Sequence, residues 1–137
     1  MNINKEPILS ICIATRNRAN VITQTLDSLI QQQTEGMEII VVDGDSEDDT
    51  QEILEEYTSA HPNLIYYFKE SENSGVDGDY DKAVKYAHGK YCWLMTDDDL
   101  LREDAISQII TKLYADFDFY FIDTEVRDKN LRRILEI

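Results

Sequence analysis

Apolar residues recur along this chain in two patterns, one typical of buried strands and the other of amphipathic helices. Short, nearly continuous apolar runs predict five strands, at residues 8–14, 38–43, 64–68, 91–95 and 117–126. Apolar residues at helical spacing predict the helices between them, at residues 21–33, from 46 to a break at 61–63, 80–88 and 103–115. This alternation predicts a three-layer α/β/α fold, in which helices cover both faces of a mostly parallel, Rossmann-like sheet.

Polar clusters follow three of the predicted strands, at residues 15–18, 43–46 and 96–99. In open parallel sheets, ligands bind beyond the carboxyl ends of the strands, where these clusters are expected to meet. Residues 96–99, Thr-Asp-Asp-Asp, place three carboxylates after a buried strand, where their repulsion favours a hard divalent cation. Such a cation can also bind phosphate oxygens, so the clusters predict a metal-dependent nucleotide site. Ser46 has a purely structural alternative role, as the N-cap of the helix that follows.

Composition and charge narrow the classes of function. The chain has 137 residues, of which 42% are hydrophobic, so we expect a single domain with a real core over residues 1–137. A net charge of −15 argues against nucleic acid and anionic lipid as partners, because both are polyanions. Cys12 and Cys92 lie in apolar runs and are expected to be core residues of a protein in a reducing compartment. With two histidines and no CxxC pair, we expect no zinc site, and the absence of a long apolar stretch predicts a soluble chain.

Four segments resemble, in the right order, motifs of the family-2 glycosyltransferases, which have the GT-A fold. They are LSICIATRNR at 9–18, VVDGDSEDDT at 41–50, ENSGV at 72–76 followed by AHGKY at 87–91, and the acidic strand end at 96–99. Residues 79–84 together with 91–101 look most like the abequosyltransferase-type branch. Because the resemblance covers nearly the whole chain, it implies the nucleotide-diphospho-sugar transferase version of the predicted α/β fold.

The resemblance implies a site for a nucleotide-diphosphate sugar and a divalent metal ion, Mn2+ or Mg2+. Asp43 matches the family carboxylate that hydrogen-bonds the base, and Thr15 begins the turn that lines the nucleoside pocket. Asp98 is the first choice of metal ligand and Asp97 the second, whereas Asp99 either caps the next helix or supports a ligand. The expected nucleotide-sugar contacts are Thr15, Arg16, Asn17, Arg18, Asp43, Ser46, Gly75, Tyr80, Asp81 and Asp97, and the expected metal ligands are Asp97, Asp98 and Asp99.

Several positions depart from the family pattern. Arg16 replaces an aromatic residue of the base pocket, although an arginine can still stack or pair with phosphate. Thr96 stands where the first Asp of the Asp-x-Asp metal motif usually is, so fewer protein ligands are expected. Tyr80 and Asp81 stand where many members have Arg-Asn. The resemblance therefore leaves the base and the donor sugar open.

The resemblance implies the donor-binding half of a glycosyltransferase that moves a sugar onto a hydroxyl of a saccharide or lipid-linked saccharide in surface-polysaccharide synthesis. The general base and the acceptor-binding half are then expected beyond Ile137, outside this truncated domain. We expect a cytoplasmic location, or a peripheral one at the inner face of the membrane in a full-length protein. An exposed sheet edge where the second half should dock favours a homo-oligomer.

Two other classes of function compete with this interpretation. One is a non-catalytic acidic α/β module that binds a divalent ion or a partner protein, since acidic runs are commonly solvated surface. The other is a sugar nucleotidyltransferase, which uses similar phosphate and metal chemistry. A nucleotidyltransferase is expected to carry a Gly-rich opening loop with Arg and Lys, and residues 14–18 do not supply one.

Overall fold

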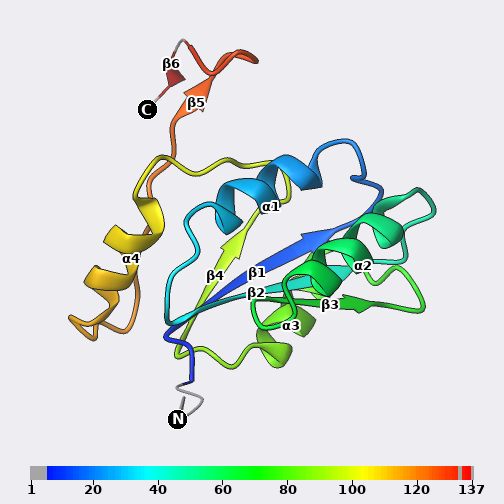
Figure 1. Cartoon of the computed structure of the whole chain (residues 1–137), viewed down its shortest axis with the longest axis horizontal. Helices are drawn as coiled ribbons and strands as arrows, with labels where there is room; N and C mark the ends of the chain where they lie inside the picture. The colour runs from blue at the N-terminus through cyan, green and yellow to red at the C-terminus, as the bar shows by residue number, and fades with distance from the viewer. Residues whose placement is uncertain (1–5, 133, 137) are drawn as a thin grey trace.

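The computed structural model describes residues 6–132 and 134–136, and its centre is a parallel sheet with strand order β3-β2-β1-β4 (Figure 1). All three strand pairings in this sheet are parallel. The strands are β1 (Leu9–Thr15), β2 (Met37–Asp43), β3 (Ile65–Lys69) and β4 (Tyr91–Met95). The helices are α1 (Ile22–Ile30), α2 (Thr50–Ala60), α3 (Val76–Tyr86) and α4 (Ala105–Leu113), and β5 (Val126–Arg127) and β6 (Ile134–Glu136) form a separate antiparallel pair.

The two faces of the sheet have separate cores, which confirms the three-layer α/β/α prediction. Ile11 and Ile13 of β1 pack in the larger core, which also contains buried residues of α1, α2 and α4. On the opposite face, Cys12 belongs to a smaller cluster with Ala83 of α3. Every residue of β1 and β2 is buried, because both strands are central and covered on both sides. Each fully buried Leu or Ile side chain stabilises the fold by roughly 1.5–3 kcal/mol.

Several predicted boundaries were wrong, and local contacts explain the differences. The second helix begins at Thr50 rather than at Ser46, because the Asp48 carboxylate accepts hydrogen bonds from the Thr50 N–H and hydroxyl. Ser46 therefore does not cap this helix. Helix α3 begins at Val76, four residues earlier than predicted, after Gly75 at a φ of 82°. Asp99 does not cap α4, whose N-cap position is Asp104.

The predicted fifth strand at residues 117–126 is wrong over most of its length, since only Val126–Arg127 is extended and paired. Asp116 has a φ of 61° and turns the chain after α4. The Tyr120 hydroxyl then donates a hydrogen bond to the Lys112 carbonyl and accepts one from the Phe117 N–H. These bonds hold the segment against the end of α4, where it lies without backbone pairing to the four-stranded sheet.

Strand β4 matches the predicted residues 91–95, but it is buried on one face only. Cys92 and Leu94 are exposed, so the prediction that Cys92 is a core residue was wrong, whereas Cys12 is buried as expected. The reason is that α3 packs over β1 and β2 and leaves that face of the edge strand β4 uncovered. Within the described part of the chain, no helix combines the length and the apolar character needed to cross a membrane.

A buried polar network connects the amino ends of β1 and β2 to the turn between α3 and β4. The Ser10 hydroxyl donates to Glu38 Oε1 at 2.5 Å and accepts the Gly89 N–H at 2.8 Å. The His88 N–H donates to the same Glu38 oxygen at 2.7 Å. Ser10 and Glu38 are 0% and 4% exposed, so the network is protected from water and rigid.

Replacing Ser10 with alanine should lower the free energy of unfolding by about 1–3 kcal/mol, because Glu38 and the Gly89 N–H lose a partner in a buried place. Urea denaturation followed by circular dichroism measures this change. The control is Ser59→Ala, since the Ser59 hydroxyl bonds only the Glu55 carbonyl on the exposed side of α2 and its loss should cost less than about 0.5 kcal/mol. Equal stability of the two variants would contradict the role given to the network.

Candidate functional site

A cavity of about 440 Å³ opens at the carboxyl ends of β1 and β4, beside the start of α3. Its lining includes seven of the predicted site residues, namely Thr15, Arg16, Arg18, Gly75, Tyr80, Asp97 and Asp98. It also includes Ala14, Asn73, Val76, Asp79 and Thr96. The parallel register explains why these residues lie together. Strands that start at the same level also end at the same level, so the loops that follow them lie at one edge of the sheet.

Asp97 is the most constrained carboxylate of the cavity. Its Oδ2 accepts a hydrogen bond from the Thr15 hydroxyl at 2.8 Å and lies 3.6 Å from Nε of Arg18. The Thr25 hydroxyl holds the Asp97 carbonyl at 3.0 Å. Burial raises the pKa of Asp97, although the Thr15 bond and the Arg18 charge oppose the rise, and the neighbouring Asp98 charge adds to it. The side chain is therefore a buried negative charge that is only partly compensated.

The acidic strand end offers two carboxylates to the cavity rather than three. Asp97 and Asp98 line it, whereas Asp99 is exposed and lies outside the lining. Over residues 6–132 and 134–136, no three His, Cys, Asp or Glu side chains are clustered as a metal site. Two carboxylates still fit a Mg2+ or Mn2+ ion that takes its other ligands from water and phosphate. The undercompensated charge of Asp97 is the feature of this chain that a cation would relieve.

Asp43 is fully buried and its hydrogen bonds come from the protein itself. Oδ1 accepts the Ser46 N–H at 2.8 Å and the Ser46 hydroxyl at 2.7 Å, and Oδ2 accepts the Tyr67 hydroxyl at 2.9 Å. Burial raises the pKa of Tyr67, and the bond to the Asp43 carboxylate raises it further. Asp43 and Ser46 thus lie beneath the loop after β2 and are not among the lining residues of the cavity.

Asn17 links the loop after β1 to the loop after β2. Its N–H donates to the Ser46 hydroxyl oxygen at 2.9 Å, and its side-chain oxygen accepts the Glu47 N–H at 2.8 Å. These bonds hold Asn17 in the left-handed conformation, at a φ of 54°. Asn17 therefore supports the wall of the cavity, while its neighbours Arg16 and Arg18 line it.

Helix α3 contributes Tyr80 to the cavity and turns Asp81 away from it. The Tyr80 hydroxyl donates to the Met95 carbonyl at 2.8 Å, which ties the helix to the end of β4. Asp81 is exposed and pairs with Lys85 at 2.5 Å, one helical turn later. Such exposed pairs contribute little to stability.

Five lining residues are outside the predicted set of site residues, and Asp79 is the only charged one among them. Asp79 is 3% exposed and sits in the first turn of α3. The missed signal is its spacing, because Asp79 lies one helical turn before the inward-facing Ala83 and therefore shares its face.

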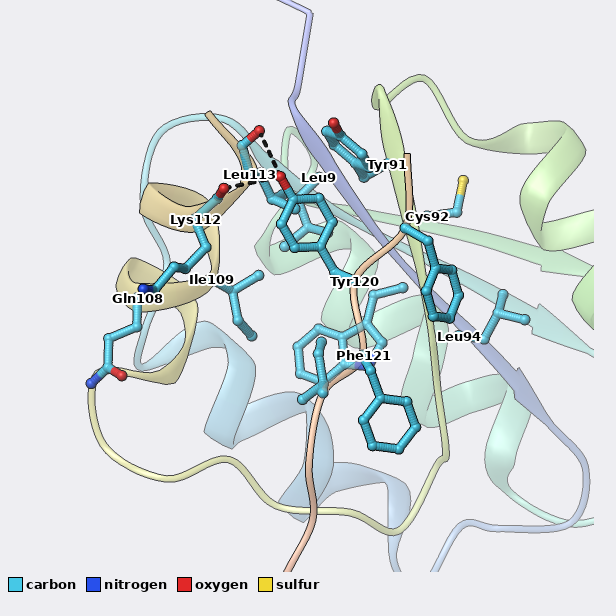
Figure 2. Close-up of a pocket in the computed structure, with 13 residues that line it drawn as sticks. Leu9, Tyr91, Cys92, Leu94, Gln108, Ile109, Lys112, Leu113, Tyr120 and Phe121 are labelled. Carbon is cyan, nitrogen blue, oxygen red and sulfur yellow. Dashed lines mark hydrogen bonds between the residues drawn. The ribbon is translucent and has the colours of Figure 1, made fainter. Parts of the chain in front are cut away.

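A second hollow, of about 590 Å³, lies between β4, α4 and residues 119–122 (Figure 2). Its lining is mostly apolar, and Lys112 is the one charged side chain among the residues that form it. Figure 2 shows Tyr120 beside α4, with its hydroxyl bonded to the backbone at Lys112 and Leu113. Of these two cavities, the smaller one therefore contains nearly all of the charged side chains.

Comparisons with known proteins agree with this geometry. The profile of a family described as glycosyl transferase family 2 matches residues 10–135. The abequosyltransferase RfbV of Salmonella typhimurium is 31% identical to this chain over 118 residues, which are 85% of the chain and 35% of that relative. This chain therefore spans about a third of the length of that curated relative.

Solved structures give the same result for the fold. TarS of S. aureus in complex with UDP-GlcNAc is 26% identical, with a TM-score of 0.71 over 78% of this chain and 31% of the TarS chain. The mannosyltransferase PcManGT of Pyrobaculum calidifontis, in complex with GDP-Man and Mn2+, is 24% identical, with a TM-score of 0.69 over 80% of this chain and 33% of that chain. The expected GT-A fold is confirmed.

Replacing Asp97 with asparagine should raise the melting temperature at neutral pH, because the buried charge is removed. Below about pH 4, the ordinary pKa of an aspartate, Asp97 is protonated in both folded and unfolded wild-type chains and the two proteins should melt alike. As pH rises, the unfolded wild-type chain ionises first, so the wild type loses stability that the variant keeps. Thermal melts across this pH range measure the difference.

The matched control is Asp99→Asn, which removes an exposed carboxylate two positions away and should leave the melting temperature nearly unchanged. If Asp97→Asn raises the melting temperature by the same amount at every pH, the explanation is wrong, because the effect would not depend on the ionisation of Asp97.

Proposed function

This chain belongs to glycosyl transferase family 2, and on that premise we propose that its smaller cavity binds the diphosphate and nucleoside of an activated sugar. The observation that carries the proposal is that Arg16, Arg18, Asp97 and Asp98 all line one cavity at the carboxyl edge of the sheet. Arginines suit phosphate oxygens, and carboxylates suit a cation bound to the same phosphates. Thr15 and Tyr80 complete the walls on either side.

The charge of the cavity supports a metal-dependent donor site. Its charged lining consists of two arginines and three aspartates, so it is net negative and repels a bare diphosphate. A diphosphate that carries Mn2+ or Mg2+ has less negative charge and brings a cation to Asp97 and Asp98. We assign Asp98 as the first ligand and Asp97 as the second, with Asp99 at the rim. When bound, the ion would stabilise the negative charge that gathers on the leaving diphosphate.

The roles of the remaining residues follow from their contacts. Arg18 stands near Asp97 and can move its guanidinium between that carboxylate and a phosphate, since 48% of its side chain is exposed. Arg16 is also exposed, and its weak contacts with the Asp45 carbonyl and the Glu47 carboxylate leave it free to meet a ligand. Asp43, Ser46 and Asn17 act by fixing the two loops that carry these arginines.

At the level of the whole protein, we propose transfer of the sugar to a saccharide or lipid-linked acceptor in surface-polysaccharide synthesis, on the cytoplasmic side. The resemblance to an abequosyltransferase supports the reaction class. The chain spans 35% of that relative, and we place the acceptor site and the general base beyond residue 137. On this proposal the isolated chain binds donor without transferring sugar.

We also propose that the open edge of β4 associates with a second copy of the chain. Among the described strands, only β1 pairs with β4, and the hollow of Figure 2 flanks its other side. Leu94, Phe119 and Phe121 are 54%, 79% and 83% exposed there. An apolar patch next to an unpaired strand edge favours association, whereas the net charge of −15 on each copy opposes it.

A panel of nucleoside diphosphates with Mn2+ tests the donor site by thermal stabilisation. A ligand at about a hundredfold excess over its Kd should stabilise the chain by roughly 2.7 kcal/mol, and the shift should shrink without the metal. Asp98→Ala should lose the Mn2+-dependent part, whereas Asp118→Ala, an exposed acid far along the chain, should keep it. Stabilisation by Ca2+ alone, with no nucleotide effect, would instead favour an acidic ion-binding module.

Sedimentation velocity at several concentrations tests self-association. The average mass should rise with protein concentration and with added salt, because salt screens the repulsion between two acidic copies. Leu94→Glu should reduce the association, whereas Val84→Glu, at a 43% exposed position on α3, should not. A monomer at every salt and protein concentration would contradict the proposed contact.

A further inference from the structure

Asp79 is a nearly buried aspartate in the cavity wall, and one of its carboxylate oxygens has no hydrogen-bond donor among the described residues. The residue is 3% exposed and lines the cavity. Oδ1 accepts a hydrogen bond from the Ser74 hydroxyl at 3.1 Å. Within residues 6–132 and 134–136, no donor bonds Oδ2. Oδ2 is not one of the fully buried side-chain atoms that lack a partner, so it is open to the cavity, where a ligand can donate a hydrogen bond to it.

The surroundings of Asp79 hold its carboxylate in one orientation. Lys82 donates to the Ser74 hydroxyl oxygen at 3.1 Å and pairs with Glu70 at 2.8 Å. Because Lys82 occupies a lone pair of that oxygen, the Ser74 hydroxyl directs its own proton to Asp79 Oδ1. A chain of contacts from Glu70 through Lys82 and Ser74 thus fixes one oxygen of Asp79 and leaves the other to accept.

Gly44 gives this carboxylate the room it occupies. A Cβ at position 44 would lie 2.3 Å from Asp79 Oδ2 and 3.3 Å from its Cγ, closer than such atoms can approach. The carboxylate therefore presses against bare backbone at the end of β2. Position 44 immediately follows Asp43, whose own oxygens are already bonded to Ser46 and Tyr67.

We propose that Asp79 is a specificity-determining residue of the donor site, whose free oxygen accepts a hydrogen bond from the nucleoside. The inference rests on the proposed nucleotide site and deepens it. The ligand group is a donor, either an N–H of the base or a hydroxyl of the ribose, because an ionised carboxylate only accepts. Charge-assisted bonds of this kind are short and strong, and a site built to accept one rejects a ligand that lacks the donor.

The experiment is calorimetric titration with Mn2+ present, using UDP, GDP, ADP and CDP and, as a probe of the phosphate subsite alone, inorganic pyrophosphate. Asp79→Asn should weaken binding of the preferred nucleoside diphosphate at least tenfold, flatten the preference among the four, and leave pyrophosphate affinity within about twofold. Gly44→Ala should have the same effect without changing any charge, because it displaces the carboxylate. Asp77→Asn is the matched control, an exposed acid in the same first turn of α3.

The outcomes separate this inference from the function on which it rests. If the wild type binds none of the nucleotides, the proposed function fails. If the wild type binds them and Asp79→Asn binds them equally well, or loses pyrophosphate in the same proportion, the role of Asp79 is overturned. The 2′-deoxy and 3′-deoxy forms of the preferred nucleotide identify the donor, since a ribose contact predicts an affinity loss in the wild type that vanishes in Asp79→Asn. A base contact predicts equal losses in both proteins.

Discussion

The register of β1 between β2 and β4 is the constraint on which the rest of this structure depends. Thr15, the last residue of β1, pairs with Asp43 on one side and reaches Asp97 beyond the end of β4 on the other. A shift of one residue would turn every side chain of β1 to the opposite face and separate these groups. The register is in turn fixed by burial, because Ile11 and Ile13 must face one core while Cys12 faces the other.

Once the register is set, the loops after the strands have little freedom left. Asn17, Ser46, Asp43 and Tyr67 form a continuous path of hydrogen bonds from the loop after β1 to β3. Polar groups in such a path are costly to separate, because each would lose its partner in a buried place. The cavity walls are thus held before any ligand arrives, which lowers the ordering cost of binding. The arginines at the surface of this frame keep the mobility that phosphate recognition uses.

The sequence predicted the four strands of the sheet and most of the residues that line the cavity. Apolar runs indicate buried strands, and the polar clusters that follow them indicate where the strands end. The prediction missed the start of α3, since the Gly75 and Gly78 of that segment and its acids have the composition of a loop. Asp79 was missed for the same reason, because it is buried only when residues 76–79 are helical and its side chain shares the inward face of α3. Cys92 was misplaced for a different reason: a continuous apolar run does not reveal whether a strand is central or at an edge. The segment at 117–126 alternates like a strand, yet hydrogen bonds of Tyr120 determine its path.

The charge of the cavity also explains why metal and nucleotide should bind together. At physiological ionic strength, interactions are screened beyond about 8 Å, so most of the −15 charge is not felt inside the cavity. The charges that line the cavity, two arginines and three aspartates, therefore determine which ions bind there. A cation alone meets the positive arginines, and a diphosphate alone meets the aspartates, whereas the two together satisfy both sets. Each ligand should therefore strengthen the other by the same factor, which makes the acidic strand end and the arginine turn one site.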